Sequence, residues 1–118
     1  MRPAQVALAL ENSAGHLVGP RQAGLEGRAI LAFASKRTAD SDAALGKLID
    51  SYHTTAAVQI AQAYAYRGER AKAFEWLDHA FEQKDPGLVN VKTDPLFANL
   101  HADPRFPALL RKMNLPVT

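Results

Sequence analysis

Apolar residues recur with the clearest helical spacing in the middle of the chain. Ala57, Ile60, Ala61 and Tyr64 stand at positions i, i+3, i+4 and i+7, which places all four on one face of an α-helix. This pattern predicts a helix over residues 54–67.

The residues that flank this helix predict its ends and a second helix. Thr54 or Thr55 can cap its first turn, and Gly68 can adopt the left-handed conformation that ends a helix. A second stripe over residues 69–83 stops before Pro86, because proline cannot continue a helix. The stripe consists of Ala73, Leu77 and Ala80, widened by Phe74 and Phe81. Together the two helices form a predicted hairpin.

Weaker stripes predict three further helices upstream. The first lies over residues 3–12, ahead of a loop at 15–19, and the second lies over 24–36. The third begins near Asp40 or Ser41 and has the same i, i+3, i+4, i+7 spacing. Its apolar residues are Leu45, Leu48, Ile49 and Tyr52.

The C-terminal part of the chain contains aspartate–proline pairs. Asp94-Pro95 and Asp103-Pro104 each join an N-cap residue to a proline at the first helical position. The second pair opens a short helix that Asn114 can end in the left-handed region. The apolar face of that helix consists of Phe106, Leu109, Leu110 and Met113. Strand signals are limited to the short stretch 88–91, so the chain is predicted to be all-α.

Segment 54–85 has small residues where the two helices of its hairpin would cross, and large residues beside them. The residues concerned are Ile60, Ala61, Tyr64, Gly68, Ala73, Leu77 and Ala80. Their order resembles the tetratricopeptide repeat (TPR), a helix–turn–helix unit of about 34 residues. The resemblance implies a TPR-like array of antiparallel helix hairpins, an α–α superhelix, with short C-terminal capping helices.

On this resemblance, residues 1–118 form one domain in four parts. These are a half-repeat and loop (1–22), a degenerate repeat (23–53), the well-formed repeat (54–86) and a C-terminal cap (87–118). The aspartate–proline motifs are also similar to the closing TPR segment of bacterial multi-repeat proteins. Those segments often follow an adenylate-cyclase-like or winged-helix domain, but no cyclase or DNA-reading motif occurs among these 118 residues.

Composition excludes several classes of function. The chain has no cysteine, which rules out disulfides and thiolate metal sites. Its 14 basic and 12 acidic residues give a net charge of +2, and the basic residues are scattered. Nucleic-acid binding requires clustered basic charge, so we do not expect it. No apolar run approaches the ~20 residues of a membrane helix, so we expect a cytoplasmic protein without membrane contact.

Few residues suggest catalysis. His16, His53, His79 and His101 include no pair at metal-ligand spacing, and there is no nucleophile elbow or phosphate loop. Asp85, Asp94 and Asp103 each precede a proline, so turn formation explains them without a ligand. We therefore predict no enzymatic activity, no cofactor and no metal ion.

The TPR resemblance implies a concave surface lined by the first helix of each hairpin. The matching positions in this chain are Thr55, Val58, Gln59, Gln62 and Tyr66. Glutamine amides can pair with a peptide backbone, and tyrosine adds apolar area and a hydroxyl. We therefore expect a non-catalytic protein–protein interaction module that binds a peptide or helix in this groove.

Two alternative functions and one further contact remain open. The chain could be a structural or regulatory end-cap of a larger repeat protein, with no ligand of its own, or a small helical enzyme or metal protein. Val6, Leu8 and Leu10 give the first helix an apolar edge that half a repeat cannot bury. That edge predicts a homodimer through the N-terminal helix.

Overall fold

The computed structural model describes residues 20–115, and side chains from residue 24 onward. Over this range the chain is helical without any strand, which confirms the all-α prediction. The elements are α2 (Pro20–Ala34), α3 (Thr38–Tyr52), α4 (Ala57–Tyr66), α5 (Arg70–Glu82), the 3-10 helices η2 (Pro86–Asn90) and η3 (Pro95–Leu100), and α6 (Arg105–Lys112). The helix predicted over 3–12, the loop at 15–19, His16 and the apolar edge of Val6, Leu8 and Leu10 lie outside the described residues.

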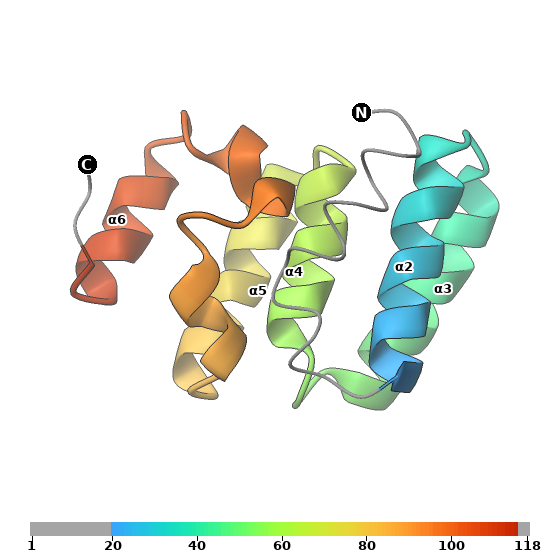
Figure 1. Ribbon diagram of the computed structural model, residues 1–118, viewed down its shortest axis with the longest axis horizontal. Helices are drawn as coiled ribbons and strands as arrows, with labels where there is room; N and C mark the ends of the chain where they lie inside the picture. Colours follow the sequence, from blue (N-terminus) through green and yellow to red (C-terminus); the bar gives the residue numbers. More distant parts are fainter. Residues whose placement is uncertain (1–19, 116–118) are drawn as a thin grey trace.

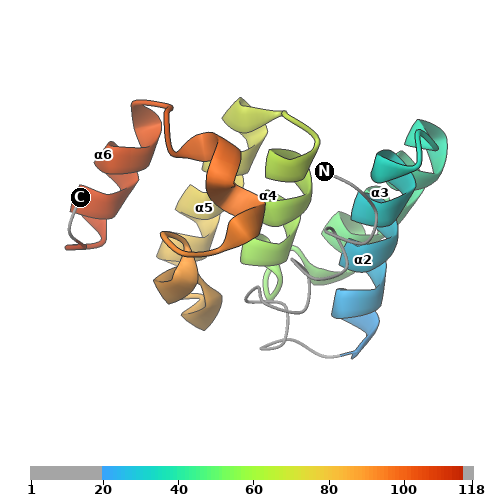
Figure 2. The same ribbon diagram turned by 45° about the horizontal axis from the view of Figure 1, so that its top comes forward.

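The helices pack as two hairpins that stand side by side. α2 makes its most extensive contacts with α3, and α4 makes its most extensive contacts with α5. Figure 1 shows the α2–α3 hairpin at one end of the molecule, α6 at the other, and α4 with α5 between them. The turned view in Figure 2 shows the same order, with η2 and η3 beside α4 and α5. No helix of the described part is long and apolar enough to cross a bilayer.

α4 lies at the centre of the core because no side of it carries a charged residue. Its ten residues include no charged side chain, and eight of them are buried. Ala61 and Ala65 join one apolar cluster with α5, η2, η3 and α6, whereas Ile60 and Ala63 join a second cluster with α2 and α3. The small residues of α4 and α5 expected at the crossing are fully buried. These are Ala61, Ala73 and Ala80.

Within residues 20–115, four turns end helices in the left-handed conformation. Gly68 has φ = 79° and Asn114 has φ = 60°, which confirms both predictions. Lys36 (φ = 64°) and Lys84 (φ = 56°) adopt the same conformation, although neither is a glycine or an asparagine. At each turn the following N–H bonds back to the carbonyl five residues earlier, as Arg37 does to Ala32 at 2.8 Å.

The starts of several helices depart from the prediction. α2 begins at Pro20 and α3 at Thr38, a few residues earlier than expected. The predicted cap of α4 is wrong, because its N-cap residue is Ala56 and no side chain caps it there. A carboxylate from further along the chain approaches instead, since Val58 N lies 3.4 Å from Asp85 Oδ2.

The aspartate–proline pairs form turns as predicted. Asp85 Oδ1 accepts from Gly87 N at 2.9 Å, and Asp94 Oδ1 accepts from Leu96 N at 3.0 Å. Asp103 Oδ1 accepts from Arg105 N at 2.9 Å, but the N-cap residue of α6 is Pro104, so the predicted N-cap at Asp103 is one residue too early. The Arg105 guanidinium also donates to Asp103, and these hydrogen bonds lower the pKa of that carboxyl to about 2.

Candidate partner-binding surface

The structure places the five predicted groove residues in different environments. Thr55 is exposed ahead of α4, and Tyr66 is half-buried at the end of it. Val58, Gln59 and Gln62 have no exposed surface at all. The expectation of an open groove is therefore wrong for these three residues in this conformation.

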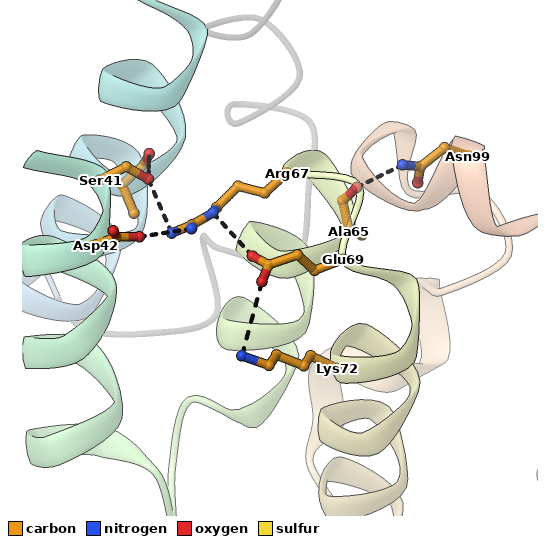
Figure 3. Close-up of polar contacts among 8 residues, drawn as sticks. Ser41, Asp42, Ala65, Arg67, Glu69, Lys72 and Asn99 are labelled. Carbon is orange, nitrogen blue, oxygen red and sulfur yellow. Dashed lines mark hydrogen bonds and ion pairs between the residues drawn. The ribbon is translucent and has the colours of Figure 1, made fainter. Parts of the chain in front are cut away.

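The face of α4 is covered by the segment that follows α5, which we call the C-terminal strap (residues 85–100). Three polar contacts join the strap to α4. They are Val58 N with Asp85 Oδ2 at 3.4 Å, Gln62 Nε2 with Asp94 Oδ2 at 2.6 Å, and Asn99 Nδ2 with the Ala65 carbonyl at 2.6 Å. The α4 positions are i, i+4 and i+7, so the strap runs along one face of the helix. Figure 3 shows the contact of Asn99 with Ala65.

Apolar side chains of the strap fill the space between these polar contacts. Phe97 and Leu100 are fully buried in the cluster of α4 and α5, and Leu96 is buried in the cluster of α2 and α3. The chain thus covers from its own sequence, with η2 and η3, the α4 face on which a partner peptide or helix was expected. One sequence signal could have predicted this burial, because a helix without charge on any side belongs in a core.

A buried polar cluster lies where α2, α4 and η3 meet. Glu26 of α2 is 1% exposed, and Gln59, Gln62 and Asp94 are also buried. Removal from water raises the pKa of Glu26 well above its ordinary value, and the nearby charge of Asp94 raises it further. Both oxygens of Asp94 are engaged, one by Gln62 and one by the N-terminus of η3. The cluster therefore fixes the position of the strap.

This polar cluster lies apart from the two cavities of the α2–α3 hairpin, because neither Glu26 nor Asp94 lines them. Among the described residues no group of three or more histidine, aspartate or glutamate side chains could hold a metal ion. Sequence analysis did not predict Glu26, although a glutamate on the inward side of an apolar stripe is a signal of a buried carboxyl.

Tyr66 lies at a corner where the two hairpins meet. Its ring meets Phe33 of α2 edge-on, with centroids 6.1 Å apart, and burial raises the pKa of the Tyr66 hydroxyl. The guanidinium of Arg67 lies 5.3 Å from the centre of the Phe33 ring. Tyr66 is therefore mainly occupied by contacts within the chain.

Arg67 connects the hairpins through charged and polar groups (Figure 3). Its guanidinium pairs with Asp42 of α3 at 2.6 Å and with Glu69 at 3.1 Å. It also donates to Ser41 Oγ at 3.4 Å, and the Ser41 hydroxyl donates to the Ala29 carbonyl at 2.7 Å. The Arg67 side chain is only 12% exposed, so this network is partly shielded from water.

The three described histidines have local contacts. His53 Nδ1 lies 3.0 Å from the Ile49 carbonyl. The His79 ring lies 5.0 Å from that of Trp76, and the His101 ring lies 4.6 Å from that of Phe106. These contacts place the three histidines on three separate elements.

Two cavities lie on the outer face of the α2–α3 hairpin, which sequence analysis did not identify as a site. They have volumes of about 380 and 510 Å³. Arg28 of α2 and Lys47 of α3 line both cavities, so the two adjoin. Leu31 and Ala44 line the first, and Tyr52 lines the second. This face combines apolar walls with basic side chains.

The TPR resemblance depends on the residues of this chain alone. Ile60, Ala61 and Tyr64 lie on α4, and the hairpin closes at Gly68 as the repeat pattern implies. Comparison of the chain with protein-family models, with curated proteins and with solved structures found no match.

Proposed function

We propose that the chain is a non-catalytic protein–protein interaction module built from TPR-like helix hairpins. The observation that carries this proposal is the outer face of α2 and α3, where two adjoining cavities combine apolar walls with Arg28 and Lys47. A surface of this kind suits a protein partner, because apolar area supplies affinity and charge supplies specificity.

The C-terminal strap restricts where a partner can bind. It occupies the α4 face on which TPR-like modules hold peptides, so a partner of this chain must use another surface. Thr55 and Tyr66 are the two predicted groove residues that retain exposed area. Their exposed areas, at the two ends of α4, are further places to test for partner binding.

The test is affinity capture with the full chain, followed by titration calorimetry with each purified partner. Wild type is compared with the double variant Arg28→Glu, Lys47→Glu and with Tyr66→Ala. We expect a partner that binds in fixed stoichiometry and is lost with one of these variants. If no protein binds in a saturable way, or both variants retain every partner, binding through these surfaces is ruled out.

A second candidate function is that of an end-cap without a ligand of its own. The strap favours it, because buried Phe97 and Leu100 close the apolar surface beside α4 and α5. An end-cap predicts that the folded chain captures no protein by itself. It also predicts that the chain stabilises a helix hairpin that is placed before it in one polypeptide.

A further inference from the structure

The outer face of α2 and α3 has a shape that fits an elongated ligand. Leu25 lines one cavity and Ala32 lines the other, seven residues further along α2. At 1.5 Å per residue, this separation corresponds to about 10 Å along the helix axis. Figures 1 and 2 show this hairpin at the end of the molecule opposite α6.

Apolar side chains form part of the wall of each cavity, and small side chains give the first cavity its depth. Ala32, Ala43 and Ala44 line the first cavity, so the backbones of α2 and α3 can be approached closely there. Leu25 and Tyr52 line the second cavity and are half-buried against the core. Each cavity can therefore accept one apolar side chain of a ligand.

The two charged side chains that line both cavities are basic. Arg28 and Lys47 are exposed and line both cavities. Neither forms an ion pair with any carboxylate in the part of the chain that the structure describes. Arg37, at the edge of the first cavity, is already paired with Asp40 at 3.6 Å. The junction is therefore complementary to a carboxylate of the ligand.

From these observations we infer that the outer face of α2 and α3 binds an acidic amphipathic helix of a partner protein. Two apolar side chains of that helix, at i and i+7, enter the two cavities, because their spacing of about 10 Å matches that of the cavities. A glutamate or aspartate at i+3 or i+4 lies between them, opposite Arg28 and Lys47. The inference rests on the proposed function and names its surface and partner.

A second copy of the chain does not supply such a helix from its described residues. Val89, which lies in η2, is the exposed large hydrophobic residue there, with 70% of its surface accessible. Helix α5 has an exposed acidic row of Glu75, Asp78 and Glu82, but its apolar stripe is buried in its own core. The described residues of a second copy therefore do not provide the ligand helix.

The test uses labelled helical peptides of about 20 residues and the full chain, with binding followed by fluorescence anisotropy. One peptide carries leucines at i and i+7 with glutamates at i+3 and i+4. A second replaces the glutamates by lysines, and a third replaces the leucines by serines. We expect saturable binding of the first peptide, and binding at least about tenfold weaker for the other two, which is ~1.4 kcal/mol.

Protein variants assign this binding to the α2–α3 face. Arg28→Glu with Lys47→Glu should reverse the preference, so that the lysine peptide binds better than the glutamate peptide. Arg111→Glu on α6, at the opposite end, is the matched control and should leave both affinities unchanged. Ala43→Gln, at an exposed position, should weaken every peptide by filling the first cavity, and it keeps the test valid if the double variant fails to fold.

Three results would overturn the inference. The first is equal affinity for the glutamate and lysine peptides, and the second is an equal effect of Arg111→Glu. The third is a dimer of the chain in sedimentation that Ala43→Gln dissociates, since the face would then join two copies. If captured partners survive the double variant but are lost with Tyr66→Ala, while no peptide binds, this inference fails and the proposed function stands. If neither partner nor peptide binds, both fail.

Discussion

The side chain of Gln62 donates a hydrogen bond to the carboxylate of Asp94 over 2.6 Å, in the buried interior of the molecule. The two residues are 32 positions apart, so the bond fixes the C-terminal strap against the middle of α4. A glutamine expected to hold a partner therefore holds a later part of its own chain. Its acceptor also caps η3, which couples the local turn to the tertiary contact.

This pairing predicts a large energetic coupling between the two residues. Asp94→Ala should lower the free energy of unfolding by roughly 2–4 kcal/mol, because an N-cap and a buried charge-assisted hydrogen bond are both lost. Urea denaturation of Gln62→Ala, Asp94→Ala and the double variant forms a double-mutant cycle. We expect the double variant to be clearly more stable than the sum of the single effects implies. Strict additivity would show that the bond contributes nothing.

Glu26 predicts a dependence of stability on pH. The pKa of Glu26 is raised in the folded state, chiefly by burial and then by Asp94, above its ordinary value of 4.5. The folded state therefore favours the protonated carboxyl. Its contribution to stability is complete below pH 4.5 and is lost as the pH rises through the folded-state pKa.

Glu26→Gln removes this titration. Relative to wild type, the variant should gain stability as the pH rises above about 4.5, and the gain should be largest above the folded-state pKa. Urea denaturation at several pH values between about 4 and 9 measures the difference. Glu75→Gln, on the exposed side of α5, is the control for the loss of a surface carboxyl. A constant difference for Glu26→Gln would contradict the prediction.

The left-handed turns predict opposite effects for two substitutions. Gly68→Ala should destabilise the fold by roughly 1–2 kcal/mol, because alanine is strained in the left-handed conformation. The added Cβ would meet no atom within 4 Å, so the loss would report backbone strain and not a steric clash. Lys84→Gly should stabilise it by a net ~0.5 kcal/mol, since relief of strain exceeds the added entropy of the unfolded chain. Thermal unfolding measures both, with Lys84→Ala as a control expected to be near neutral. A destabilised Lys84→Gly would refute the role of strain.

The contacts of Arg67 predict that ion pairs alone do not account for its contribution to stability between the two hairpins. Arg67→Ala should cost about 2–3 kcal/mol, because it removes the ion pairs, the bond to Ser41 and the contact with Phe33. Asp42→Ala should cost less than about 1 kcal/mol, because that side chain is 59% exposed. Arg67→Lys should fall between them, since it retains charge but loses the planar donor group. Equal losses of stability for Arg67→Ala and Asp42→Ala would show that the network contributes no more than one surface ion pair.

Local signals in the sequence predicted most of the helices and their ends. The stripe from Ala57 to Tyr64 predicted α4, and Gly68 and Asn114 predicted two left-handed turns. Lys36 and Lys84 could not be identified in this way, because nothing local favours a left-handed lysine. Their conformation follows from the packing of the helices on either side.

The sequence did not predict which face of α4 is covered. The polarity of Gln59 and Gln62 indicated exposure, whereas both are buried beside Glu26 and Asp94. The partners of a buried polar group lie far away in the sequence, so periodicity within one helix cannot identify them. The basic face of Arg28 and Lys47 was missed for a similar reason, since the two residues come from different helices.

Because the ribosome makes α4 before the C-terminal strap, the face of α4 that the strap covers is exposed for a time during synthesis. The strap follows α4 in the chain, and at 5–20 residues per second the ribosome needs roughly 2–6 s to proceed from Gln62 to Asp94. During that interval Gln62 and the carbonyl of Ala65 lack their partners from the strap. The most deeply buried helix of the finished protein is therefore an accessible surface on the nascent chain, available to water or to a chaperone until η3 has been made.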